Sequence, residues 1–218
     1  MNFTRRSAFA AAVLALSGVV ASPVAGHAAT LLSEVFYDAA GSDDGQGFVE
    51  IAAAPGTVLD GLVVEAINGS DGAPTHNIVL QGTVGASGLF VLADATSAGT
   101  TSVIGADQLA NFDFQNGPDS VTLLNGVTVL DAVGYGTFAP GTFFAGEGTP
   151  TVDPSAGESI QRRFDDVDTQ DNAADWIAGA PTPGVAVRVP EPSGALLLGT
   201  GLGGLAAAGR RRRRVVAA

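Results

Sequence analysis

The segment VTLLNGVTVL, residues 121–130, carries the clearest local structural signal in this chain of 218 residues. Apolar and polar residues alternate on both sides of Asn125-Gly126, which is the period of a β-strand with one buried face. Asn-Gly between two such runs is typical of a two-residue hairpin turn, because both residues tolerate a positive φ. We therefore predict a β-hairpin at this position.

Further short runs of apolar and β-branched residues lie on either side of the hairpin, bounded by Gly, Ser and Asp. They predict strands at residues 31–37, 48–51, 58–67 (one long strand or two short ones), 78–80, 89–92 and 159–164, the last of the series, with one helical turn at 107–112. No long stretch of residues 30–185 shows the helical spacing of apolar residues. Short strands recurring about every ten residues predict an all-β, immunoglobulin-like β-sandwich, although composition alone does not separate a sandwich from a barrel.

Residues 30–185 are strongly acidic. They hold 21 acidic residues against Arg162 and Arg163, which gives a formal charge of −19, and the whole chain has no lysine. Such a charge repels phosphate and argues against binding of DNA or RNA. With only two arginines, we expect at least one ion pair with a carboxylate on a strand. The absence of cysteine excludes disulfides, zinc–thiolate sites and cysteine nucleophiles.

The first 29 residues have the organisation of a secretory signal peptide. Arg5 and Arg6 precede an apolar stretch at residues 8–20, and small residues follow up to Ala28 and Ala29. A basic region, an apolar region and small residues near a cleavage point are typical of such signals. We expect cleavage after Ala28 or Ala29, by the general secretory route rather than the twin-arginine route.

Residues 186–218 form a separate tail with three parts. These are the motif Pro190, Glu191 and Pro192, the uncharged Gly- and Leu-rich run 194–209, and the cluster Arg210, Arg211, Arg212, Arg213 and Arg214. An apolar run stopped by arginines indicates a membrane segment, predicted to form an apolar helix, whose arginine end stays in the cytoplasm. Its 16 residues are fewer than the roughly 20 that a spanning helix needs, which favours a cleavable signal over a permanent anchor.

The order of these three parts at the extreme C-terminus resembles the PEP-CTERM sorting tail of bacterial exported proteins. The resemblance implies that an exosortase, a membrane cysteine peptidase, reads and cleaves the tail at the outer face of the inner membrane. It also implies a transient stay in that membrane, a final place at the cell surface or outside the cell, and a link to exopolysaccharide or biofilm. The alternative is an ordinary tail-anchored helix.

A series of motifs within residues 30–185 resembles the lamin tail domain in its bacterial versions. In order they are LSEV (32–35), FVEI (48–51), LDGL (59–62), GLFVL (88–92), GPDSVTL (117–123), VLDAVGYG (129–136), ESIQR (158–162), residues 168–172, DW (175–176) and PTPG (181–184). Two features depart from the family pattern: AAA (52–54) stands where Tyr-Asn is usual, and the loop 137–157 resembles an insertion. The resemblance implies an immunoglobulin-like sandwich that is used for binding or as an accessory module and carries no catalytic residues. The partners that we expect are extracellular polysaccharide or envelope proteins.

Residues able to perform catalysis are few. After removal of the signal, His76 is the one histidine, in a predicted turn, and no nucleophile motif surrounds it, whereas a Ser-His-Asp relay needs all three groups. Glu34 and Glu50 lie in predicted strands and could form a glycosidase pair. The competing interpretation is that each faces solvent or pairs with Arg162 or Arg163.

Two acidic loops offer oxygen ligands for calcium, which prefers six to eight of them. One contains Asp43 and Asp44. The other, residues 165–172, offers the candidate ligands Asp166, Asp168 and Asn172, with Gln170 between them, but it lacks the Gly and Glu of an EF-hand loop. Asp171 is alternatively expected to cap a turn leading to Trp176, the sole tryptophan, which we place in the core. No other cofactor is predicted.

These observations together predict a non-enzymatic exported surface or extracellular-matrix protein that is processed by an exosortase. Two alternatives of other classes remain, a carbohydrate-active hydrolase built on a β-sandwich and a calcium-dependent adhesin.

Overall fold

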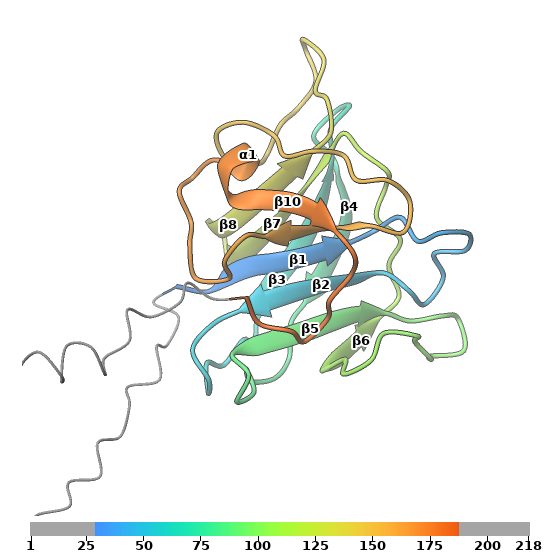
Figure 1. Ribbon diagram of the computed structural model, residues 1–218, viewed down its shortest axis with the longest axis vertical. Helices are drawn as coiled ribbons and strands as arrows, with labels where there is room; N and C mark the ends of the chain where they lie inside the picture. Colours follow the sequence, from blue (N-terminus) through green and yellow to red (C-terminus); the bar gives the residue numbers. More distant parts are fainter. Residues whose placement is uncertain (1–28, 188–218) are drawn as a thin grey trace, which may run out of the picture.

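The computed structural model describes residues 29–187, which form a β-sandwich of two packed sheets, as predicted (Figure 1). The six-stranded sheet has the order β10 (Trp176–Gly179), β9 (Ser159–Arg162), β1 (Leu31–Phe36), β2 (Phe48–Ala52), β5 (Leu89–Asp94), β6 (Gln108–Ala110). The four-stranded sheet has the order β4 (Pro74–Val79), β3 (Leu62–Asn68), β7 (Asp119–Asn125), β8 (Thr128–Tyr135). A short helix, α1 (Asn172–Asp175), precedes β10.

The main core lies between the two sheets and is built from alternate residues of the strands. The six-stranded sheet contributes Leu32, Val35, Val49, Ile51, Phe90 and Leu92, and the four-stranded sheet contributes Val64, Ala66, Val121, Leu123, Val133 and Tyr135. Successive side chains of a strand point to opposite faces, so one apolar face per strand is enough to build this core.

The outer faces of the two sheets differ. β4 alternates between buried and exposed residues, as expected of a strand with one wet face. In contrast, β1, β2 and β5 are buried at every residue. Their outer face is covered by Val103 and Ala106 of the loop after β5 and by residues 180–187, which we call the strap. Figure 1 shows the chain after β10 crossing this face of the six-stranded sheet.

The predicted hairpin is present as β7 and β8, but its turn lies one residue further along the chain. Asn125 pairs with Thr128, so the two loop residues are Gly126 and Val127. Gly126 has φ +61°, whereas Val127 is not among the residues with a positive φ. A two-residue hairpin turn with a positive φ only at its first loop residue favours glycine at that position. Gly126 is therefore the first loop residue, whereas the prediction made it the second.

Residues 107–112 do not form the predicted helical turn. Residues 108–110 form β6, which pairs in parallel with β5 at the edge of the sheet. The Gln108 side chain donates to Val79 O and accepts from Gln81 N, both at 2.9 Å. These contacts with a distant part of the chain outweigh the weak local preference for a turn.

Two other strand predictions need correction. The run 58–67 forms one regular strand only from Leu62, while Val58 makes an isolated bridge with Thr83. The strand β9 is not the last one, because β10 follows it and pairs with it along the edge of the sheet. A four-residue strand that begins with the sole tryptophan has no alternation long enough to reveal it.

The predicted signal peptide, Pro190, Glu191, Pro192 and the cluster from Arg210 to Arg214 lie outside the described residues 29–187, apart from Ala29. Within that described part, no helix is long and apolar enough to cross a membrane.

Candidate functional site

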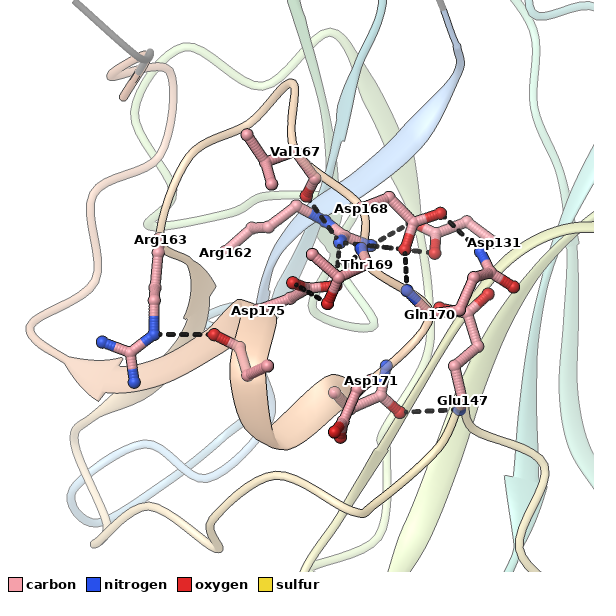
Figure 2. Close-up of polar contacts among 12 residues, drawn as sticks. Asp131, Glu147, Arg162, Arg163, Val167, Asp168, Thr169, Gln170, Asp171 and Asp175 are labelled. Carbon is pink, nitrogen blue, oxygen red and sulfur yellow. Dashed lines mark hydrogen bonds and ion pairs between the residues drawn. The ribbon is translucent and has the colours of Figure 1, made fainter.

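Arg162, the last residue of β9, lies at the centre of a buried polar network (Figure 2). Its side chain is fully buried, and its Nη2 donates to both carboxylate oxygens of Asp131 at 2.8 Å. Its Nε donates to Leu32 O at 2.9 Å, and Leu32 N donates to Asp131 Oδ2 at 2.6 Å. Because Asp131 is on β8 and Leu32 on β1, this network joins the two sheets. It provides the predicted ion pair with a strand carboxylate, in a buried rather than an exposed place.

The chain after β9 folds back over the guanidinium group. Arg162 Nη1 donates to Val167 O at 3.0 Å and to Asp175 Oδ2 at 3.3 Å. Asp175 also accepts from Thr169 N at 2.8 Å and from Thr169 Oγ1 at 2.7 Å. The guanidinium carbon lies 4.9 Å from the ring centroid of Trp176, which is buried in the core as predicted and close enough for a cation–π contact. Together these contacts offset the cost of burying the charges.

Asp171 and Asn172 fix the entry into α1. The Asp171 side chain accepts a main-chain N–H of α1, so the predicted capping role is confirmed. Asn172 is fully buried. Its Oδ1 accepts from Gly134 N and Glu147 N, both at 2.9 Å, and its Nδ2 donates to Ala132 O at 2.8 Å. Both polar atoms of Asn172 are thus committed to the main chain of β8 and of the loop 137–157.

Three carboxylates from different parts of the chain meet beside this network, and we call them the carboxylate triad: Asp131, Glu147 and Asp168. One oxygen of each lies within 4.8 Å of the others. Asp168 also lies 3.7 Å from Arg162 Nη1, with 18% of its side chain exposed. Glu147 Oε2 is buried and has no hydrogen-bond partner among the described residues. A buried carboxylate oxygen without a partner is costly, which makes Glu147 the unsatisfied member of the triad.

The electrostatics of the triad favour the uptake of positive charge. Burial, and after it the charges of Asp131 and Asp168, raise the pKa of Glu147 to about 7 against the opposing charge of Arg162. Burial also raises the pKa of Asp131, again opposed by Arg162. Near neutral pH, the buried charge of Glu147 can therefore be neutralised by a proton or by a divalent cation such as calcium, which prefers carboxylate oxygens.

The three candidate calcium ligands from the sequence have different places. Asp166 is exposed and is not part of the triad. Asn172 holds the main chain, and Asp168 alone belongs to the triad. Sequence reasoning missed Asp131 and Glu147 as partners of Asp168. For Asp131 a signal was available, because an acidic residue within the apolar run of β8 needs a buried partner. Glu147 lies in an irregular loop and offers no comparable signal.

Glu34 and Glu50 neither face solvent nor pair with an arginine. They are direct partners on β1 and β2, with exposed fractions of 2% and 1%, and the strap covers them. Burial raises the pKa of Glu34, and it raises the pKa of Glu50 to about 7. Their oxygens accept hydrogen bonds from serine, threonine and main-chain donors. The pair therefore fastens a segment to the sheet and does not converge on a cleft, as a glycosidase pair would.

The other acidic loop surrounds a polar pocket of about 390 Å³, lined by Asp43 and Asp44 together with Asp94 and Asp113. Asp94 is buried, and its two oxygens accept main-chain N–H groups of the loops after β1 and β6. Asp43 accepts a main-chain N–H in the same way. These contacts give Asp43 and Asp94 a role in holding loops together.

His76 lies on β4 rather than in a turn. Its ring nitrogens lie 3.4 Å from Thr75 Oγ1 and from Asp113 N, and its ring lies 5.6 Å from that of Phe114. None of these contacts within the described part of the chain is with a carboxylate that would orient His76 as a catalytic base.

Comparison with known proteins gave no match: no protein-family model, no curated protein and no solved structure corresponds to this chain.

Proposed function

We propose that this chain is an exported bacterial protein without enzymatic activity, which an exosortase processes at the outer face of the inner membrane before it reaches the cell surface or extracellular matrix. The observation that carries the proposal is the order of its parts: a signal-like N-terminus, a β-sandwich, and a tail of Pro190-Glu191-Pro192, apolar run and arginine cluster. In this proposal the sandwich is immunoglobulin-like and related to the lamin tail domain. Its partners are exopolysaccharide or envelope proteins.

The buried charges of the sandwich support a binding or structural role. Arg162, Asp131, Glu34 and Glu50 are all engaged in contacts that join strands, sheets or the strap. Charged groups that hold the fold in this way are committed to main-chain and side-chain partners, whereas a catalytic pair must remain open to substrate.

Replacing Glu191 with Ala is expected to abolish processing of the tail, because the proposal places recognition in the Pro-Glu-Pro motif. The intact mass of the protein from its native host would then retain residues up to Ala218, and the protein would stay in the membrane fraction. Glu158→Ala, a change at the half-buried residue before β9, is the matched control and should leave processing unchanged. A mature mass that is the same for Glu191→Ala and the parent would contradict the proposal.

A second candidate function, calcium-dependent adhesion, is favoured by one specific observation. Glu147 Oε2 is buried without a partner in the carboxylate triad. Calcium sites of extracellular modules have dissociation constants of about 10⁻⁴–10⁻³ M, and the nearby Arg162 favours the weaker end of that range. Here the cation would bridge Asp131, Glu147 and Asp168 and would displace the proton from Glu147.

Calcium at 10 mM is expected to raise the melting temperature of the protein at pH 8 by about 3–4 °C, if the dissociation constant is about 1 mM. The shift should be smaller at pH 5.5, because Glu147, whose pKa is about 7, holds a proton there. Glu147→Gln should remove the calcium effect, while Asp166→Asn, which lies in the loop of Asp168 but outside the triad, should keep it. An equal shift in both variants would exclude the triad as the site.

A further inference from the structure

A pocket of about 360 Å³ lies where β3 ends and β7 begins. Its polar lining consists of two amide side chains, two hydroxyl groups and one carboxylate, with a proline beside them: Asn68, Gln115, Ser70, Thr142, Asp119 and Pro118. Within the described part of the chain, no arginine, lysine or histidine lines it. The volume is at the lower end of the range of about 300–1,000 Å³ found for small-molecule sites. The pocket therefore has room for one small polar ligand.

Asn68 and Asp119 place an amide and a carboxylate side by side in this pocket. They are direct partners on the neighbouring strands β3 and β7, so their Cβ atoms lie about 4.5–5.5 Å apart on one face of the sheet. Asn68 Oδ1 accepts from Ser70 N at 2.7 Å, and Asp119 Oδ1 accepts from Gly69 N at 2.6 Å. The turn after β3 thus fixes both side chains and leaves Asn68 Nδ2 and Asp119 Oδ2 for a ligand.

The carboxylate of Asp119 is buried more deeply than its contacts explain. Only 7% of the residue is exposed, and burial raises its pKa, opposed by the hydrogen bond from Gly69 N. None of the ion pairs found within residues 29–187 includes Asp119. A buried carboxylate with one hydrogen bond leaves most of its capacity as an acceptor unused. A hydroxyl group that donates to Oδ2 would supply a second bond, of the short and strong kind that charged acceptors form.

An aromatic ring borders the pocket. Phe143 follows the lining residue Thr142, and Phe143 N donates to Gly69 O at 2.7 Å. The ring rests on Gly72, because a Cβ at that glycine would come within 3.0 Å of three ring atoms. Nevertheless 49% of Phe143 is exposed, so the side of the ring away from Gly72 faces solvent. Such a ring offers an apolar surface of negative potential to C–H groups of a ligand.

We propose that this pocket binds one uncharged sugar unit of a polysaccharide. One hydroxyl group of the sugar donates to Asp119 Oδ2, the adjacent hydroxyl accepts from Asn68 Nδ2, and C–H groups of the sugar ring pack against Phe143. Because a hydroxyl both donates and accepts, two adjacent hydroxyls match a carboxylate beside an amide.

The charge of the pocket selects against acidic sugars. Its lining contains a carboxylate and no cation, and residues 30–185 carry a formal charge of −19, which repels an anionic ligand. This inference rests on the proposed function for the origin of the sugar, a polysaccharide outside the cell, and on the pocket for its chemistry.

The first arm of the test is saturation-transfer NMR of the full-length protein. The probes are the methyl α-glycosides of glucose, galactose and mannose. At least one of them should bind with a dissociation constant on the order of 1 mM, the affinity usual for a ligand of about 13 non-hydrogen atoms. The uronic acid form of the same glycoside should bind at least about tenfold more weakly. Absence of binding by all three neutral glycosides at about 20 mM, well above that constant, would overturn the proposal.

The second arm places the sugar in the pocket. Asp119→Asn retains an acceptor for Gly69 N but removes the charge, and it should weaken binding about tenfold. The matched control is Asp71→Asn, which removes one charge from the exposed turn after β3, retains an acceptor for Ala73 N and lies outside the pocket. It should bind as the parent does. Phe143→Ala, at an exposed residue, should weaken binding about two- to tenfold. Parental affinity in both Asp119→Asn and Phe143→Ala would overturn the pocket as the site.

These results are separable from the test of processing. If no neutral glycoside binds while Glu191→Ala blocks processing, the sugar pocket is overturned and the sorting proposal stands. If a glycoside binds through Asp119 while Glu191→Ala leaves processing unchanged, the sorting proposal is overturned and the pocket stands.

Discussion

Replacing Arg162 with methionine is expected to lower the free energy of unfolding by about 3–5 kcal/mol, the usual cost of leaving buried carboxylates without their cation. The variant would retain Asp131 and Asp175, which are 0% and 4% exposed, without the guanidinium group that both contact. A loss of this size is a large part of the 5–15 kcal/mol that is typical of a folded domain. Urea denaturation of the mature protein, followed by tryptophan fluorescence of Trp176, would measure it.

The neighbouring residue provides a matched control. Arg163 is exposed and donates from Nε to Ala174 O at 2.9 Å, so Arg163→Met should change the free energy of unfolding by no more than about 0.5 kcal/mol. Replacing Asp131 with Leu in addition to Arg162→Met should cost less than the sum of the two single changes, because the double variant buries one fewer unpaired charge. Equal effects of the two arginine variants would contradict the network as described.

Replacing Asn172 with alanine is expected to cost about 2–5 kcal/mol, because it leaves Gly134 N, Glu147 N and Ala132 O without their partner, at about 1–3 kcal/mol for each group that stays buried. The loss should be the same in 10 mM calcium and in a chelator, since Asn172 bonds the main chain. Asp166→Ala, an exposed change in the same loop, should be neutral in both. A loss that appears only in calcium would show instead that Asn172 is a ligand.

The β-sandwich and its core could be predicted because alternation is a local property. Val121 and Leu123 are buried by the period of two that their own segment displays. The same local argument failed for Glu34 and Glu50. It offered a glycosidase pair, a solvent-facing place or an arginine partner for them. The sequence around β1 and β2 does not reveal that residues 180–187, more than 120 positions further along, cover these side chains.

Two further errors have the same origin. β6 is three residues long, and it forms a strand because it pairs in parallel with β5. An argument from the local sequence of residues 107–112 does not take account of such a non-local partner. At the carboxylate triad, the acidic loop was recognised through Asp168, but its partners come from a strand and from the loop 137–157. The sequence showed that an arginine would need an acid; it did not show which of the 21 acids between residues 30 and 185 would be chosen.

The burial of Arg162 has a consequence for how the protein survives in a medium that contains proteases. Trypsin-like enzymes cut only after lysine or arginine, and residues 29–187 contain no lysine and two arginines. Arg162 is fully enclosed, so Arg163 is the one accessible cleavage point in the whole described region. Its main-chain N–H donates to Asp175 O at 2.7 Å, which holds that peptide segment against the end of α1. The sandwich thus offers this large class of digestive enzymes a single, tethered target.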